Sequence, residues 1–352
     1  MSPPTRTDID PDIDPVLLPD THPASHPVLG DLQRKYVSRT PHMREIGLTV
    51  TALGPGRGAM RLPDRPDWLG DPARGWLHTG PVTVLADSTC GLAVGAALPK
   101  RVPYATLDLR MDYLGAARPG QPVHCEAHCY RLTRSVAFVR GEVWQADRQM
   151  PVASVQASFM LSTPAGTHPS QQPSRPPAKD AAQQATATAT TAAGADADAD
   201  ADAPWLAPTG LAPALAGSLI PYAEYLRIHL ASGGDAPLFC LPFQDTLIGN
   251  PYLPALHGGV VAGFAETAAT LQLVRSVAGA KLPKCIDFSI DYLRAGRAEA
   301  TYAACEVVRL GGRVALVQVR CWQSKGPAQP IAVARGHFLL TPAGAMLAPA
   351  SP

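Results

Sequence analysis

The stretch HGGVVAGFAE at residues 257–266 decides the fold, because a close variant of it occurs earlier in the chain. That variant, HTGPVTVLAD, occupies residues 78–87, at an offset of 179 residues. Three further blocks repeat in the same order at offsets of 179 or 178 residues: LDLRMDYL (107–114) with IDFSIDYL (286–293), VAFVRGEVWQ (136–145) with VALVQVRCWQ (314–323), and Phe159 with Phe338. Agreement over four separated blocks in one order predicts two copies of one domain.

Each copy is predicted to contain a long helix followed by strands, after a short amphipathic stretch (29–39 in the first copy, 220–230 in the second). The apolar run that opens at each His-Gly motif continues for about 15 to 20 residues, which suits a buried helix better than a strand. Pro81, at about the first helical position, fits this start. The hydrophobic period then changes to two, which is typical of successive antiparallel strands. We therefore expect an α+β fold in which a sheet wraps around each central helix.

Composition changes abruptly between the two copies. The segment 164–204 is rich in Ala, Thr, Gln, Pro and Asp, so it cannot bury enough apolar area to offset the entropy lost on ordering. The predicted organisation is a disordered tail at 1–27, a first domain at 28–163, a flexible linker at 164–204, a second domain at 205–345 and a C-terminal tail at 346–352.

Charge and composition limit the kinds of binding partner and the cellular compartment that we expect. Lys plus Arg total 30 and Asp plus Glu total 29, a balance that gives no electrostatic reason to expect nucleic acid or an anionic membrane as partner. The sequence has no apolar run of about 18 residues and no signal-peptide pattern, so we expect a cytoplasmic protein. Seven scattered cysteines without a CxxC pair predict reduced thiols and argue against a zinc site.

Both copies resemble the PaaI-type acyl-CoA thioesterases of the hotdog fold. The resemblance rests on an apolar helix that opens at His-Gly-Gly, an acidic residue nine positions after the His, and a strand that ends in Asp-Tyr-Leu. It is closest over GNPYLPALHGGVVAGFAET (249–267), and LGDPARGWLHTGPVTVLADSTCG (69–91) is a variant. It implies a double hotdog, with two antiparallel sheets around long central helices paired as an intramolecular pseudo-dimer. It also implies hydrolysis of an acyl-CoA without metal or other cofactor.

In the resembled family, an amide at the helix start polarises the thioester carbonyl, and an acidic residue activates water or attacks directly. These roles fall on the amides of Gly258 and Thr79 and on the carboxylates of Asp87 and Glu266. Gly258 and Glu266 are eight residues apart, or about 12 Å along a helix at about 1.5 Å per residue, too far for both to touch one carbonyl. The sequence therefore predicts two composite sites: the Asp87 site, with the Gly258 amide, and the Glu266 site, with the Thr79 amide.

Other side chains distinguish the two predicted sites. Asn250, in the loop before the second helix, would join the Asp87 site, and Thr270, four residues after the acid, would assist in the Glu266 site. The first copy has Asp71 where the second has Asn250. We expect the Asp87 site to be the better catalyst, because Asp71 would add negative charge close to the developing oxyanion of the Glu266 site.

The two histidines of the motif are predicted to be structural. His78 and His257, with Gly259, are expected to hold the loop at the helix start. No second His or carboxylate stands at ligand spacing, so no metal site is predicted.

Candidate substrate-binding residues lie further along the chain. Tyr113 and Tyr292, in the repeated DYL, either line an acyl tunnel or pack in the core. Arg294 and Arg313 either meet the phosphates of CoA or are solvated surface charges. The sequence leaves both alternatives open.

Two other functions remain open beside acyl-CoA hydrolysis. The substitutions in the first copy are compatible with a non-hydrolytic acyl-thioester binding module. A hotdog hydratase or dehydratase is the other alternative, although that chemistry usually employs a catalytic His paired with an acid. Association of pseudo-dimers into a homo-oligomer is also left open.

Overall fold

The computed structural model describes residues 27–100, 102–161, 211–213, 220–231, 238–250, 252, 254–277 and 281–342. The predicted linker at 164–204, the C-terminal tail at 346–352 and the N-terminal tail up to residue 26 lie outside the described residues. The proposed domain boundaries therefore stay predictions.

Each repeat has one long helix followed by four long strands, as predicted. The elements of the first repeat are α1 (Pro27–Leu32), η2 (Gln33–Val37), α2 (Pro41–Glu45), β1 (Thr49–Gly54), β2 (Arg57–Leu62), η3 (Pro66–Trp68), β3 (Leu69–Asp71), β4 (Trp76–Leu77), α3 (Thr79–Ala97), β5 (Tyr104–Tyr113), β6 (Val123–Leu132), β7 (Val136–Trp144) and β8 (Ala153–Leu161). Those of the second are β9 (Leu211–Pro213), α4 (Pro221–Tyr225), β10 (His229–Ala231), β11 (Leu238–Leu241), η4 (Asp245–Leu247), β12 (Ile248–Asn250), β13 (Ala255–Leu256), α5 (Gly258–Ser276), β14 (Lys281–Tyr292), β15 (Thr301–Leu310), β16 (Val314–Trp322) and β17 (Ala332–Pro342).

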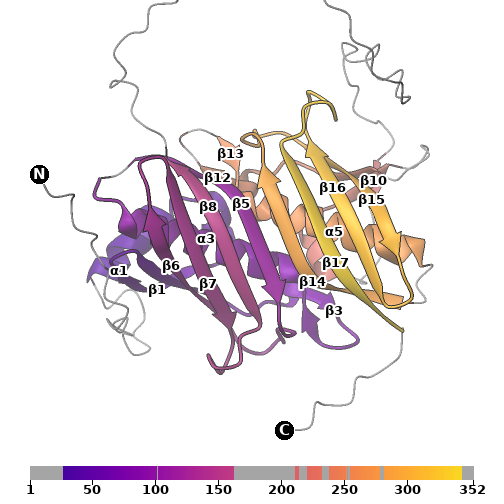
Figure 1. Cartoon of the computed structure of the whole chain (residues 1–352), viewed down its shortest axis with the longest axis horizontal. Coiled ribbons are helices and arrows are strands. Elements are labelled where there is room, and N and C mark those ends of the chain that lie inside the picture. The colour runs from indigo at the N-terminus through magenta and orange to yellow at the C-terminus, as the bar shows by residue number, and fades with distance from the viewer. Residues whose placement is uncertain are drawn as a thin grey trace, which may run out of the picture.

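Apart from the separate pairs β3–β4 and β12–β13, the strands of both repeats form one continuous antiparallel sheet (Figure 1). Its 13 strands follow the order β1-β2-β6-β7-β8-β5-β14-β17-β16-β15-β11-β10-β9. The two halves join where β5 pairs with β14, with Ser289 opposite Arg110 at the centre of the pairing and Ile290 opposite Leu109 beside it. The sequence predicted two sheets and did not indicate that they join edge to edge.

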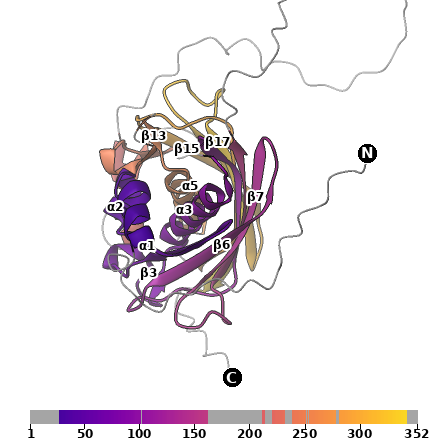
Figure 2. The same cartoon turned by 90° about the vertical axis from the view of Figure 1, so that its left-hand side faces the viewer.

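The sheet curves along one side of the central helices α3 and α5, while α1 and α2 lie on the other side (Figure 2). Every residue of α3 from 80 to 94 is buried, and most of α5 is buried as well. A helix that is apolar on all sides is stable only where neighbours cover all of it. The acids Asp87 and Glu266 therefore lie in a region where an unpaired charge is costly.

The two central helices run antiparallel and cross closely at glycines. A Cβ added to Gly259 would lie 2.7 Å from the Cα of Val84, and one added to Gly263 would lie 3.4 Å from the Cα of Gly80. As the residue number rises on one helix it falls on the other, so each helix start lies beside the middle of its neighbour. Glycine is required at Gly259 because any side chain there would meet backbone.

The short helices before each central helix correct one detail of the predicted repeat. The counterpart of α4 is α2, because both begin at a proline and both precede an edge region of the sheet. The predicted counterpart, 29–39, instead contains the end of α1 and all of η2. Both stretches are amphipathic, so the pattern alone could not distinguish them.

Two findings bear on the compartment and the redox state. No helix within the described residues is long and apolar enough to cross a membrane. The seven cysteines all lie within the described residues as free thiols. The cytoplasmic location stays a prediction.

Candidate active site

The Asp87 site joins the middle of α3 to the first turn of α5. Oδ2 of Asp87 accepts a hydrogen bond of 2.8 Å from the Gly259 amide, and Oδ1 accepts one of 3.0 Å from the Thr106 hydroxyl. The Tyr292 hydroxyl donates to the Gly258 carbonyl at 2.8 Å. Burial raises the pKa of Asp87 to about 6, although the bonds from Thr106 and Gly259 act in the opposite direction.

The Glu266 site joins the middle of α5 to the first turn of α3 in the reverse sense. One carboxylate oxygen of Glu266 accepts from the Thr79 hydroxyl, and the other accepts from the Tyr113 hydroxyl at 2.9 Å. The side chain is fully buried. Burial raises the pKa of Glu266 to about 7, while hydrogen bonds from Thr79, Tyr113 and the Cys285 thiol act to lower it.

The motif histidines cap the two helices. Nδ1 of His78 accepts from the Gly80 amide at 2.9 Å, and Nδ1 of His257 accepts from the Gly259 amide at 3.1 Å. Because Nδ1 accepts, the proton of each neutral ring is assigned to Nε2; in His257, Nε2 lies 3.1 Å from the Ser88 hydroxyl. Burial lowers the pKa of His78 to about 3 and that of His257 to about 4. Both rings are therefore neutral near pH 7, and the role of holding the loop stays a prediction.

One amide at each helix start remains available to a ligand. Within the described residues, neither the Gly258 nor the Thr79 amide N–H has a hydrogen-bond acceptor. Free amides in the first turn carry the positive end of the helix dipole and can stabilise a developing oxyanion.

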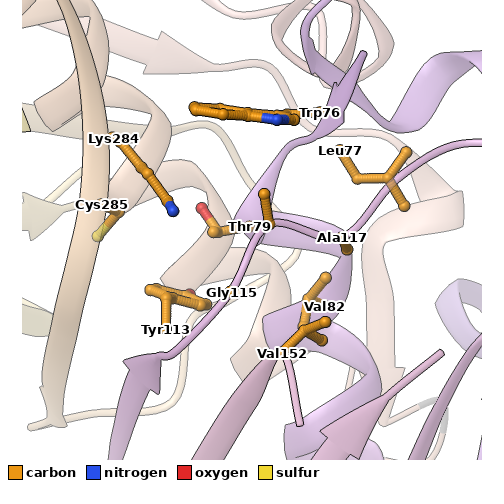
Figure 3. A pocket seen from close by; sticks show the side chains of 11 residues that line it. Trp76, Leu77, Thr79, Val82, Tyr113, Gly115, Ala117, Val152, Lys284 and Cys285 are labelled. Atoms are coloured by element: carbon orange, nitrogen blue, oxygen red, sulfur yellow. The ribbon is translucent and has the colours of Figure 1, made fainter. Parts of the chain in front are cut away.

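A pocket opens beside the Glu266 site (Figure 3). Thr79, Tyr113 and Cys285, whose polar groups contact the Glu266 carboxylate, all line it. The rest of its lining is mostly apolar: Trp76, Leu77, Val82, Gly115, Ala116, Ala117, Val152 and Lys284. A ligand in the pocket would reach the groups that surround the buried acid.

Two predicted site residues use their side chains elsewhere. Asn250 is exposed, and its Oδ1 accepts from the Tyr252 amide at 3.0 Å, which stabilises the turn after β12. The Thr270 hydroxyl donates to the backbone carbonyl of Glu266 at 3.0 Å. The catalytic roles assigned to Asn250 and Thr270 therefore stay predictions.

The two candidate arginines lie at opposite ends of β14. Arg294 lies two residues after the end of β14 and donates to the Pro330 carbonyl at 2.6 Å. Arg313 is exposed in the turn between β15 and β16, where its carbonyl pairs with Leu340, opposite Pro283. Eleven residues of strand separate the two positions, about 35 Å at about 3.3 Å per residue. They cannot bind one phosphate group together.

The charge of Asp71, which was the reason for ranking the Glu266 site below the Asp87 site, is neutralised by a neighbouring arginine. Asp71 is paired with Arg74 at 2.7 Å, and its Oδ1 also accepts from the Arg74 amide at 3.1 Å. Its negative charge is therefore locally compensated and gives no ground for ranking the Glu266 site second.

Sequence reasoning missed two residues that contact the acids. Thr106 bonds to Asp87 and Cys285 contacts Glu266, and the two stand at equivalent positions of the repeat, one residue before the block that ends in DYL. Their shared position was a usable signal.

Comparisons with known proteins point to one family. The profile of the thioesterase superfamily matches residues 74–152 and 253–328, one match in each repeat. A search of curated proteins found no match.

Solved structures show the same architecture. The chain is similar to a putative thioesterase from Novosphingobium aromaticivorans (17% identity, TM-score 0.51, covering 80% of this chain and 95% of that one). It is similar to the acyl-CoA thioesterase II TesB2 from Mycobacterium marinum (13%, TM-score 0.50, 82% and 94%). It is also similar to a hot dog fold protein of unknown function from Alicyclobacillus acidocaldarius (13%, TM-score 0.50, 80% and 93%). At these identities the likeness extends to the fold, and the predicted double hotdog is confirmed.

Proposed function

This chain belongs to the thioesterase superfamily, and from that premise we propose that it hydrolyses an acyl-CoA at composite sites between its two repeats. One reciprocal observation carries the proposal: the acid on each central helix lies against the first turn of the other. Asp87 accepts from the Gly259 amide at 2.8 Å in one direction, and Glu266 accepts from the Thr79 hydroxyl in the other. Thioester hydrolysis needs an acid beside such helix-start amides.

At the Glu266 site, the thioester carbonyl oxygen would accept from the Thr79 amide. The ionised Glu266 carboxylate would take a proton from water as the water attacks the carbonyl carbon, or would attack that carbon itself. One amide donor stabilises the developing oxyanion by about 3 kcal/mol. In either route, collapse breaks the carbon–sulfur bond and the departing thiolate takes up a proton to give CoA. Attack by water yields the free acid directly, whereas attack by Glu266 leaves a mixed anhydride that a water molecule then hydrolyses to the free acid and the regenerated carboxylate.

The Glu266 site is the better supported of the two. Three of the residues around its acid line a pocket, which indicates the side from which a substrate would approach. A carboxyl with a pKa of about 7 is partly ionised near neutral pH and retains a driving force for accepting a proton. The Asp87 site keeps the same plan and is proposed as the second site.

The histidines weigh against a hydratase. That chemistry needs a His that can exchange a proton with the substrate beside an acid. Nδ1 of His257 does lie 3.5 Å from the Asp87 carboxylate, but it already accepts a hydrogen bond from the Gly259 amide. Burial also lowers the pKa of His257 to about 4. A base held by the backbone in this way is poorly placed to take a proton from a substrate.

The test is release of free thiol from short, medium and aromatic acyl-CoAs. Wild-type protein should release CoA from at least one of them, and the Asp87→Asn, Glu266→Gln double variant should release none above background while keeping its circular dichroism spectrum. Binding without thiol release would instead identify a binding module. A change in a double bond without thiol release would identify a hydratase.

A further inference from the structure

One cation enters the pocket of the Glu266 site. Lys284, from β14 of the second repeat, lines the pocket beside the first turn of α3, and its ammonium group extends toward the Thr79 hydroxyl (Figure 3). Its Nζ lies 5.1 Å from the ring centroid of Trp76, which supplies a cation–π contact. The ammonium group therefore stands near the position where the thioester would react.

This ammonium group lacks a counter-ion. Within the described residues, no carboxylate lies within ion-pair distance of Lys284. The side chain is partly buried, and burial lowers its pKa from the ordinary value for lysine. An aromatic face compensates only part of the cost of desolvating a charge, because a cation–π contact is weaker than a charge-assisted hydrogen bond to an anion. A bound anion would supply the missing partner.

The cation belongs to one of the two sites only. At the offset of 179 residues, Ala105 stands where the second repeat has Lys284, and Ala255 stands where the first repeat has Trp76. The pair is therefore not part of the plan that the repeats share. It is an addition to the Glu266 site, which indicates a difference in what that site accepts.

We propose that Lys284, supported by Trp76, makes the Glu266 site selective for acyl groups that carry a carboxylate at their far end. This inference rests on the proposed thioesterase function. The ligand anion is assigned to the acyl group because Lys284 precedes Cys285, which contacts the reacting carboxylate of Glu266. The phosphates of CoA are separated from the thioester by the full pantetheine arm, too far to reach an amine so close to the acid.

Binding tests the proposal without depending on turnover. In the Asp87→Asn, Glu266→Gln double variant, calorimetry would compare glutaryl-CoA, which ends in a carboxylate, with pentanoyl-CoA, which ends in a methyl group. Glutaryl-CoA should bind about tenfold more tightly, the size expected for one charge-assisted hydrogen bond that is partly screened. Lys284→Met should remove that preference and leave the pentanoyl-CoA affinity within about twofold.

Two further variants keep the result interpretable. Lys284→Arg keeps the charge and should restore most of the preference for glutaryl-CoA. Lys325→Met removes an exposed lysine that does not line the pocket and should change neither affinity. If Lys284→Met weakened both ligands equally, the amine would bind the CoA moiety and the proposal would be wrong. The proposal would also be wrong if the Asp87→Asn, Glu266→Gln double variant with Lys284 intact bound both ligands equally, or bound neither of them detectably.

Turnover separates this proposal from the proposed function. Wild-type protein that releases thiol from pentanoyl-CoA and glutaryl-CoA with equal kcat/KM would be a thioesterase without the proposed selectivity. Wild-type protein that releases thiol from no acyl-CoA would contradict the proposed function itself. If Lys284→Met lowered kcat alike for both substrates, Lys284 would stabilise the transition state and would not select the acyl group.

Discussion

The Asp87 site and the Glu266 site occupy equivalent places in the repeat but are built from different groups. In the first, the carboxylate accepts directly from a backbone amide at the helix start. In the second, a threonine hydroxyl lies between the helix start and the carboxylate. The equivalent tyrosines also differ, since Tyr113 donates to the acid and Tyr292 donates to a backbone carbonyl.

This difference shows what a duplication preserves. The antiparallel crossing of α3 and α5 requires glycine and small residues, so the backbone plan is kept in both copies. The side chains that contact the two acids differ between the copies, Thr106 at Asp87 and Thr79 with Tyr113 at Glu266, so these groups can change without loss of the fold. A fused pair of repeats, unlike a symmetric homodimer, can therefore specialise its two sites separately.

The largest expected effect distinguishes the two sites by their acids. Glu266→Gln should lower kcat/KM at pH 8 by about 100-fold or more, because a general base contributes about 10²- to 10⁴-fold. Asp87→Asn should cost less than about tenfold, because the accessible site keeps its base. Steady-state thiol release with circular dichroism as the folding control measures both. The reverse order of effects would return the main activity to the Asp87 site.

The next effect is a difference in pH dependence between the sites. A base must be ionised to act, so activity is lost as the pH falls through its pKa, by about tenfold per pH unit. In Asp87→Asn the profile of kcat/KM should have a midpoint near 7, since burial raises the pKa of Glu266 to about 7. In Glu266→Gln the residual activity should have a midpoint near 6, since burial raises the pKa of Asp87 to about 6. Coincident midpoints would contradict the assignment of one acid to each activity.

A smaller effect concerns the two tyrosines. Tyr113→Phe removes a hydrogen bond to the ionised form of Glu266, so the pKa of that carboxyl should rise. In the Asp87→Asn background, the pH midpoint should move up by about one unit, with the high-pH plateau retained. Tyr292→Phe is the matched control, because its hydroxyl donates to the Gly258 carbonyl and should leave the midpoint unchanged. An equal shift in both variants would show a general packing effect.

The sequence predicted the fold because the repeat preserved element order and hydrophobic period over four blocks. It did not predict the join between β5 and β14. In that join Leu109 lies opposite Ile290, a residue about half the chain away in sequence. Each of the two strands forms one edge of its own half of the sheet. Nothing in the alternation of either strand indicates which other edge will cover it.

The acids and helix starts were predictable because they lie in one continuous motif. The alternation of the strands did not indicate Thr106 and Cys285, because each precedes an irregularity in its strand pairing, between Thr106 and Asp108 and between Cys285 and Asp287. A bulge shifts the alternation of inward and outward side chains by one residue. Counting back by twos from the buried ends of these strands therefore passes over both residues. Lys284 was missed because the other repeat has no equivalent cation.

The smallest expected effect concerns Thr270, predicted from the family resemblance to assist the acid. Its hydroxyl donates to the Glu266 backbone carbonyl one helical turn earlier, a bond that contributes little to a helix. Thr270→Val should therefore change kcat/KM by less than about twofold, and Thr270→Ser, which keeps the hydroxyl, should behave alike. A loss above about tenfold in Thr270→Val alone would show that the hydroxyl turns toward the substrate during the reaction. Since the first repeat has Gly91 at this position, that result would make the hydroxyl another difference between the two sites.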